Sequence, residues 1–232
     1  MSIPTEKRRQ LRTISGEIAL FIRNAILTGQ LAVGSKIDQQ SIADEFGVSL
    51  IPVREALRQL EAEELLQIEP YRGAYVKELS IDDLREIYVV RETLEQLAAE
   101  LAVPRLDQST LQELQQQLVL MEEATEILDF ERLFELNRSF HFAIYTQSGN
   151  TTLIQLIESL WDRSTVYRRI YTYLPARARQ ALLEHRAILA ACMAGDQQIA
   201  GKAVRENVSQ TTRTILNLKQ KEKGDDGNTS RK

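Results

Sequence analysis

Residues 66–76 form the one segment of the sequence that reads as a pair of β-strands. The stretch from Pro70 to Gly73 supplies the turn between the two strands. Side chains typical of strands lie on either side of this turn: Leu66, Ile68, Tyr75 and Val76. The pattern from Ser80 onward is helical, so the sequence predicts a mainly α chain with one small ribbon near its start.

Three helical segments precede the ribbon. Residues 14–27 carry apolar side chains at helical spacing. A second, short helix at residues 39–46 is stopped by Gly47, and a third opens at Ser49 and extends to about Glu63. Two short helices joined by a tight turn and followed by a β-ribbon form a winged helix-turn-helix. In that unit the second helix of the pair enters the major groove of DNA.

The charge composition alone does not identify a nucleic-acid binder. The 232 residues include 29 Lys and Arg and 33 Asp and Glu, which gives a net charge of −4. Residues 1–60 contain 8 basic and 6 acidic side chains, whereas the other 172 residues contain 21 and 27. A DNA-binding function therefore depends on where a few cations lie rather than on their total.

The third helix places two of these cations together. Arg54 and Arg58 are four residues apart, so they share one face of the helix and can reach base edges or phosphates. The alternative is that both are solvent-exposed charges paired with Glu55 or Glu61 on a surface helix. The β-ribbon directly downstream favours DNA binding.

Three further residues lie where a winged helix-turn-helix contacts DNA. Ser49, at the start of the third helix, offers a hydroxyl or a backbone N–H to a phosphate. Arg72 lies at the tip of the ribbon and reaches a neighbouring groove or backbone. Lys36 precedes the second helix and is placed for another contact.

The same stretch resembles the GntR family of bacterial repressors over residues 14–77. The motifs that carry the resemblance are GVSLIPVREALRQLE and the wing sequence RGAYV. The resemblance implies that the residues listed next serve DNA binding: Lys36, Ser49, Arg54, Arg58 and Gly73. Gly73 would let the backbone of the wing approach the DNA closely.

Three positions depart from the family pattern. Leu50 stands where the family usually has arginine, and Ile51 replaces the common threonine. Glu64 stands where a glycine usually ends the recognition helix. The operator sequence therefore does not transfer from relatives, and the end of this helix is expected to differ.

The remainder of the chain is predicted to be an antiparallel bundle of about six amphipathic helices. The first of these helices begins after Ser80 and has this apolar stripe: Leu84, Ile87, Val90, Leu94, Leu97 and Leu101. The two histidines of the chain, His141 and His185, each lie among apolar residues on a helix. A lone histidine in such a place is more often a core residue than a ligand.

This second part resembles the FCD effector domain of the FadR subfamily over residues 80–215. In many such proteins an Asp or Asn and three histidines bind a divalent metal in the core of the bundle. The matching positions are Asn137, His141, His185 and Asn207. Neutral imidazoles suit zinc or nickel, but two imidazoles and two amides form an incomplete, weak site without negative charge.

A small organic acid is the other expected ligand of the bundle. A carboxylate would supply the missing charge to a weakly held metal, or the same four residues would bind the acid directly without a metal. The other candidates for this pocket are Arg91, Glu95 and Arg138. A hydrolase built on His141 and His185 is a third hypothesis, but no nucleophile elbow or HExxH motif accompanies them.

Together these features predict a homodimeric transcriptional regulator rather than an enzyme. Its partners would be a near-palindromic double-stranded operator and a small-acid effector that modulates operator affinity; a metal-responsive regulator is the alternative. We expect a winged helix-turn-helix domain at residues 10–78, a helical effector-binding and dimerisation domain at 80–218 and a disordered tail at 219–232. Repressor and activator remain open.

The remaining composition sets the compartment that we expect. No segment approaches the run of about 18 apolar residues that a membrane span needs, and residues 1–13 lack the apolar core of a secretory signal. A single cysteine, Cys192, excludes an internal disulfide and suits a reducing compartment. The expectation is therefore a cytoplasmic protein without a membrane partner.

Overall fold

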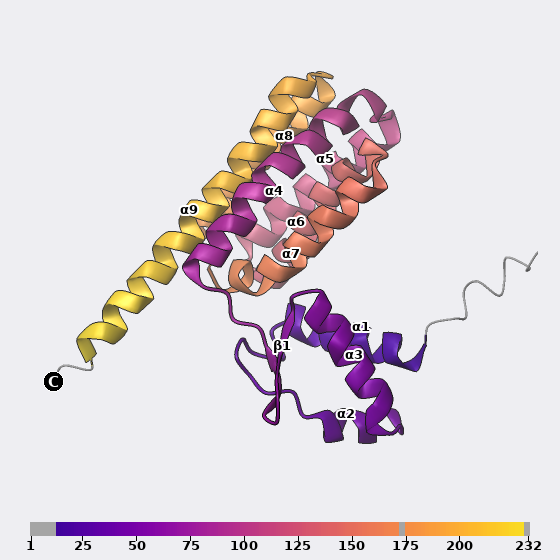
Figure 1. Cartoon of the computed structure of the whole chain (residues 1–232). Helices are drawn as coiled ribbons and strands as arrows, with labels where there is room; N and C mark the ends of the chain where they lie inside the picture. The colour runs from indigo at the N-terminus through magenta and orange to yellow at the C-terminus, as the bar shows by residue number, and fades with distance from the viewer. Residues whose placement is uncertain (1–12, 172–174, 230–232) are drawn as a thin grey trace, which may run out of the picture. The chain divides into compact units, whose positions relative to one another are not determined.

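The computed structural model describes residues 13–171 and 175–229, and the side chains of these residues except 166, 168–171 and 219–229. The chain divides after Glu78 into two compact units (Figure 1). The N-terminal unit contains α1 (Ile14–Leu27), α2 (Gln39–Phe46), α3 (Leu50–Ala62), β1 (Leu66–Glu69) and β2 (Gly73–Val76). The C-terminal unit contains α4 (Ile81–Ala102), α5 (Gln108–Glu126), α6 (Phe130–Tyr145), α7 (Thr151–Tyr171), α8 (Pro175–Met193) and α9 (Gln197–Thr229). The predicted fold class, mainly α with one small ribbon, is confirmed.

The helices of the N-terminal unit pack around one apolar core. α1 lies against α3, and α2 and β1 also contact α3. On α3 the buried apolar side chains are Val53, Ala56, Leu57 and Leu60, which recur at helical spacing. Because one face of α3 is buried in this way, its opposite face is left to the solvent.

The ribbon is antiparallel and has more support than its two strands alone provide. Leu66 pairs with Val76 at the base of the ribbon. Lys36, in the segment before α2, forms a β-bridge with Tyr75. The segment before the helix pair is therefore attached to the edge of the wing, which fixes the wing against the helices.

Two turns in this unit use the left-handed backbone conformation. Gly47 ends α2 with φ of 64°, a conformation that glycine adopts without strain. Glu64, after the end of α3, has the same φ of 64° although it is not glycine. Glu64 thus ends the recognition helix in a backbone conformation that favours glycine. Its carboxylate forms an ion pair with Lys77, which follows β2.

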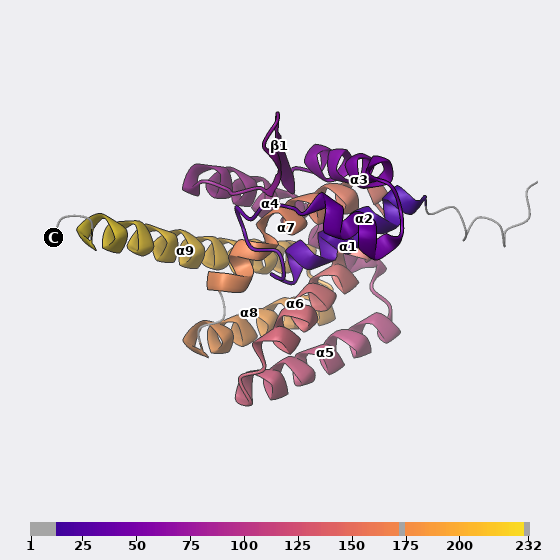
Figure 2. The same cartoon turned by 90° about the horizontal axis from the view of Figure 1, so that it is seen from below.

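The C-terminal unit is an all-helical bundle. α4 packs against α9, α7 and α6, while α5 packs against α6 and α8, and α8 against α9 (Figures 1 and 2). The core between these helices is mainly aliphatic and aromatic, and includes Phe140, Ile144, Ile157 and Trp161. α8 begins at Pro175, where proline is well tolerated because the first N–H of a helix has no partner within it.

The buried face of α4 differs from the predicted stripe. Leu84 and Ile87 are buried as expected, but Val90, Leu97 and Leu101 are 38–47% exposed. The interior positions in the second half of the helix are taken by Arg91, Glu95 and small alanines. The prediction is wrong because α4 carries apolar side chains on two faces. The face that packs against the bundle is the one with Arg91 and Glu95, because these two residues bond to each other and to buried residues of α7.

The last helix also differs from the prediction. We expected it to end near Leu218 and residues 219–232 to be disordered, but α9 continues to Thr229 (Figure 1). No proline interrupts residues 219–229, and the lysine, glutamine and glutamate of residues 219–223 are good helix formers. Gly224 and Gly227 are poor helix formers, so local propensity accounts for the extension only as far as residue 223. The remainder of the predicted tail, residues 230–232, lies outside the described residues. Within the described part of the chain, no helix combines the length and apolar character needed to span a bilayer.

Candidate DNA interface and polar core of the bundle

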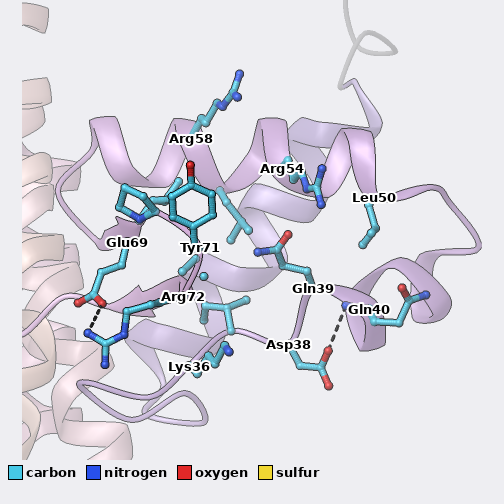
Figure 3. Close-up of a pocket in the computed structure, with 16 residues that line it drawn as sticks. Lys36, Asp38, Gln39, Gln40, Leu50, Arg54, Arg58, Glu69, Tyr71 and Arg72 are labelled. Carbon is cyan, nitrogen blue, oxygen red and sulfur yellow. Dashed lines mark hydrogen bonds and ion pairs between the residues drawn. The ribbon is translucent and has the colours of Figure 1, made fainter.

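α3 and the wing enclose a groove of about 830 Å³ on the N-terminal unit. Arg54 and Arg58 line it from α3, and both side chains are exposed and extend away from the helix (Figure 3). Leu50 lies one turn before Arg54 and lines the same groove. The predicted spacing of four residues therefore does place these side chains along one open face.

Neither arginine is paired with an acidic side chain of the described residues. Among the described residues, Arg54 and Arg58 form no ion pair with Glu55, Glu61 or any other carboxylate within 4 Å. Glu61 has a different role, since its carboxylate accepts a hydrogen bond of 3.1 Å from the backbone N–H of Ile68 in β1. The alternative of a salt-bridged surface helix is therefore not supported, and both guanidinium groups remain available to an anion.

The start of α3 is suited to binding a phosphate. Ser49 is the N-cap residue, but its hydroxyl makes no capping hydrogen bond and is exposed. The first N–H groups of a helix have no partner within it and carry the positive end of the helix dipole. Ser49 thus adds an unused hydroxyl to a site that already favours negative charge.

Lys36 and Gly73 meet near the tip of the wing, where Gly73 pairs with Glu69 beside the turn. A Cβ on Gly73 would lie 3.1 Å from Cε and 3.9 Å from Nζ of Lys36. Gly73 also has φ of 116°, which favours glycine. The structure therefore gives Gly73 a role within the protein, because its missing side chain leaves the space that the Lys36 side chain occupies.

The tip of the wing presents one cation and one aromatic ring. The guanidinium group of Arg72 lies 2.8 Å from the Glu69 carboxylate, yet its side chain is 74% exposed (Figure 3). Tyr71 is fully exposed beside it, with φ of 65°. The sequence reasoning did not identify Tyr71; its place in the turn between Pro70 and Gly73 was the available signal, because the residue at the apex of a tight turn has little to pack against.

The C-terminal unit contains a buried polar network centred on the Glu95 carboxylate. Glu95 accepts hydrogen bonds from Nε of Arg91 at 2.7 Å, Nε1 of Trp161 at 2.9 Å and the hydroxyl of Tyr145 at 2.7 Å. Arg91 also donates to the hydroxyl of Ser164 at 3.0 Å. Arg91 and Glu95 were predicted to line the effector pocket. The structure places them together, but their charged groups form a hydrogen bond and ion pair with each other.

Burial disfavours the charge on Arg91, but the Glu95 carboxylate together with Tyr88 and Tyr145 outweighs this effect, so the pKa of Arg91 is raised above its ordinary value. The guanidinium carbon of Arg91 also lies 4.6 Å from the ring centroid of Trp161. Both effects hold the guanidinium charged in the interior. The pair is therefore a fixed structural element of the bundle core.

The two histidines lie side by side at this network. The ring centroids of His141 and His185 are 5.0 Å apart. The Nδ1 atom of His185 lies 2.6 Å from the carbonyl of Ala181, so Nδ1 must carry the proton. Nδ1 of His141 lies 2.9 Å from the hydroxyl of Tyr145, which itself donates to Glu95, so this nitrogen also acts as the donor. In their neutral forms both rings therefore have Nε2 as the acceptor atom.

The other predicted pocket residues are only partly gathered here. Asn137 shares a face of α6 with His141, and its Nδ2 atom is buried without a hydrogen-bond acceptor among the described residues. Asn207 instead donates a 2.7 Å hydrogen bond to Glu184. Arg138 is 36% exposed and forms a 3.1 Å ion pair with Asp162, so it lies at the margin of the network.

These residues do not fit a tightly held metal. Stable sites for zinc and related ions use three or four histidine, cysteine or carboxylate ligands. No group of three or more such side chains with suitable geometry occurs among the residues that the structure describes. The imidazoles of His141 and His185 supply two ligands, and Asn207, at the position of the third, is engaged by Glu184. We therefore assign no metal-dependent step to this site.

Comparison with known proteins identifies the class of protein to which both units belong. Residues 14–76 match the family described as bacterial regulatory proteins, gntR family, and residues 86–210 match the FCD domain. The chain is 33% identical to the HTH-type transcriptional regulator McbR of Escherichia coli (strain K12) over 179 residues, which cover 76% of this chain and 81% of McbR. It therefore belongs to the GntR family of DNA-binding transcriptional regulators and carries an FCD domain.

One further relative and a solved structure of McbR agree with this assignment. The HTH-type transcriptional repressor RspR of the same organism is 27% identical over 210 residues, or 89% of this chain and 91% of RspR. The solved structure of E. coli McbR/YncC matches with a TM-score of 0.79 at 28% identity, covering 90% of this chain and 99% of that chain. The predicted function as a transcriptional regulator is thus confirmed at the level of the family.

Proposed function

We propose that this protein is a homodimeric repressor of the FadR subfamily that binds a near-palindromic operator and responds to a small organic acid. The observation that supports operator binding most directly is the open face of α3, where two exposed arginines line a groove beside the wing. RspR is named a repressor, which supports the same mode of action for this chain. Two subunits related by a twofold axis would present two α3 helices to half-sites one helical turn apart.

Substitution of an arginine on α3 tests operator binding. Arg54→Ala should weaken binding to a selected operator by about tenfold or more, because a base or charged phosphate contact is worth roughly 1–3 kcal/mol. Fluorescence anisotropy measures the affinity, and the helical circular dichroism signal should stay unchanged. Arg132→Ala, on the exposed surface of α6, is the matched control. Unchanged affinity of Arg54→Ala at moderate salt would contradict this placement of the recognition face.

The exposed apolar side of α4 supports the proposed dimer. Val90, Leu97 and Leu101 follow one another at helical spacing and are 47%, 42% and 38% exposed. An apolar row of this kind on a helix is typical of a surface that a second subunit covers. Leu97→Glu should therefore yield monomers in analytical ultracentrifugation, whereas Leu183→Glu, at a leucine of α8 that is 56% exposed, should not. A wild-type monomer, or a Leu97→Glu dimer of unchanged affinity, would contradict the proposal.

The proposed effector site is the buried polar region around His141, His185 and Asn137. The buried and unpaired N–H group of Asn137 supports it, because such a group costs free energy until an acceptor binds it. A carboxylate or hydroxyl oxygen of an acid is such an acceptor. If the acid is an inducer, linkage requires that it bind the DNA-free form more tightly than the DNA-bound form.

A ligand screen tests this site and also the alternative of a metal sensor. Small sugar acids, amino acids and dicarboxylates are added to the wild type and to Asn137→Leu, and thermal unfolding is followed. At least one acid should raise the Tm of the wild type and not that of Asn137→Leu. Zinc alone should bind weakly in calorimetry. Sub-micromolar zinc binding without any acid would favour metal sensing instead.

We propose no catalytic function for the two histidines. Nδ1 of each is engaged in a hydrogen bond within the bundle, and no serine, cysteine or threonine nucleophile is seen bonded to either ring in the described part of the chain. A reducing cytoplasm remains the proposed location, since the free Cys192 is buried and unpaired. Hydrolysis of any ester or amide in a substrate panel would contradict the first of these proposals.

A further inference from the structure

The recognition helix begins with two aliphatic side chains at the end that a helix-turn-helix inserts into the major groove. Ile51 is 68% exposed, and Leu50 is half-buried and lines the groove beside Arg54 (Figure 3). Both belong to the first turn of α3, next to the exposed Ser49 hydroxyl. The DNA-facing end of α3 therefore combines an apolar surface with the cations that follow it.

We propose that Leu50 and Ile51 form an apolar recognition end that selects thymine through its 5-methyl group. The inference rests on the DNA-binding function of α3. It goes further by assigning a base preference to the two positions at which this chain departs from the family pattern.

The chemistry of the major groove leads to this assignment. Guanine, adenine and cytosine present hydrogen-bond donors or acceptors there, whereas thymine also presents a methyl group. An aliphatic side chain can form no hydrogen bond, so a polar base edge pressed against it would lose its water without gaining a partner. Contact with the thymine methyl instead removes apolar surface of both partners from water. Leu50 and Ile51 therefore favour thymine over the other three bases.

The charged neighbours of Leu50 and Ile51 have a different role in this scheme. Arg54, one turn further along the same face as Leu50, carries the electrostatic contacts with phosphate or guanine. Arg72 on the wing supplies a contact with the backbone that does not depend on the base. Base selection by the apolar end is thus separable from overall affinity, which allows a direct test.

The test removes the methyl group without changing any hydrogen bond. Preferred duplexes are selected from a randomised pool by the full-length protein, and each thymine is then replaced in turn by deoxyuridine. At one or more thymines in each half-site, the replacement should weaken binding by about three- to fivefold, the value expected for one buried methyl group. In Ile51→Ala or Leu50→Ala, the penalty at that position should disappear. Arg72→Ala should weaken binding to both duplexes but keep their ratio.

Two results would overturn the inference. One is equal binding of thymine and deoxyuridine duplexes at every position of the selected site. The other is a deoxyuridine penalty that survives in both alanine variants, because the methyl group would then be read by another part of the protein. Failure to select any preferred sequence would overturn sequence-specific binding itself, and the inference with it. Ile51→Ser serves as a second variant, since an exposed position tolerates it without loss of fold.

Discussion

Glu95→Ala should destabilise the helical bundle far more than an ordinary surface substitution does. The change removes the carboxylate that pairs with Arg91, whose side chain is only 2% exposed. It also removes the acceptor for the Trp161 N–H group and the Tyr145 hydroxyl. Loss of one member of a buried ion pair costs about 3–5 kcal/mol, because the other charge stays buried without a partner. For a unit of this size the expected fall in Tm is about 6–20 °C.

The assay is urea and thermal unfolding followed by circular dichroism at equal protein concentration. Glu86→Ala, at an exposed position of the same helix, is the matched control and should change stability by less than about 0.5 kcal/mol. Glu95→Gln should lie between the two, because it keeps an acceptor oxygen but removes the charge. A double-mutant cycle with Arg91→Ala should show strong coupling. A loss below about 1 kcal/mol in Glu95→Ala would refute the view that Arg91 is held by this carboxylate.

Two further predictions concern backbone and capping positions. Gly73→Ala should weaken DNA binding and lower stability by about 1–3 kcal/mol through backbone strain and a clash with Lys36. Gly34 has φ of 74° and open space around it, so Gly34→Ala should lose stability through backbone strain alone. An equal loss of stability in the two variants would contradict the clash with Lys36. Asp107→Ala should lower the Tm at pH 7, because its carboxylate caps α5 through the Thr110 N–H and hydroxyl, which lower its pKa from 3.8 to about 2. Because the pKa of Asp107 is lower in the folded than in the unfolded protein, this stabilisation is present above about pH 4 and is lost as the pH falls towards 2. A difference in Tm between Asp107→Ala and wild type that stays constant over this pH range would contradict the prediction.

Local sequence signals predicted the N-terminal unit well. Gly47 identifies the turn of the helix pair because glycine adopts the left-handed conformation easily, and the turn residues after Pro70 identify the wing. The open face of Arg54 and Arg58 follows from helical spacing alone. The contact between Lys36 and Gly73 could not be predicted, because it joins residues far apart in the sequence and depends on the bridge to the ribbon.

The polar core of the bundle was predicted only in part. Arg91 and Glu95 are spaced as an ordinary surface ion pair of a helix, and nothing in the local sequence distinguishes a buried pair from an exposed one. What buries them is Trp161, which lies 66 residues after Glu95 and donates to it from α7. For the same reason the predicted stripe of α4 included Leu97, whose outward position depends on which face the other helices cover.

The ion pair between Glu64 and Lys77 joins the end of the recognition helix to the strand that leaves the wing. Leu65 strengthens this connection, since its carbonyl accepts a 3.0 Å hydrogen bond from the Lys77 N–H. The end of α3 and the end of the wing are thus joined by an ion pair and a backbone hydrogen bond at the point where the chain leaves the N-terminal unit. A displacement transmitted through this segment would move α3 and the wing together rather than separate them. In the dimer proposed above, an effector signal that passes through this segment would therefore change the separation of the two winged units along the DNA, while the contacts of each unit with its half-site would stay constant.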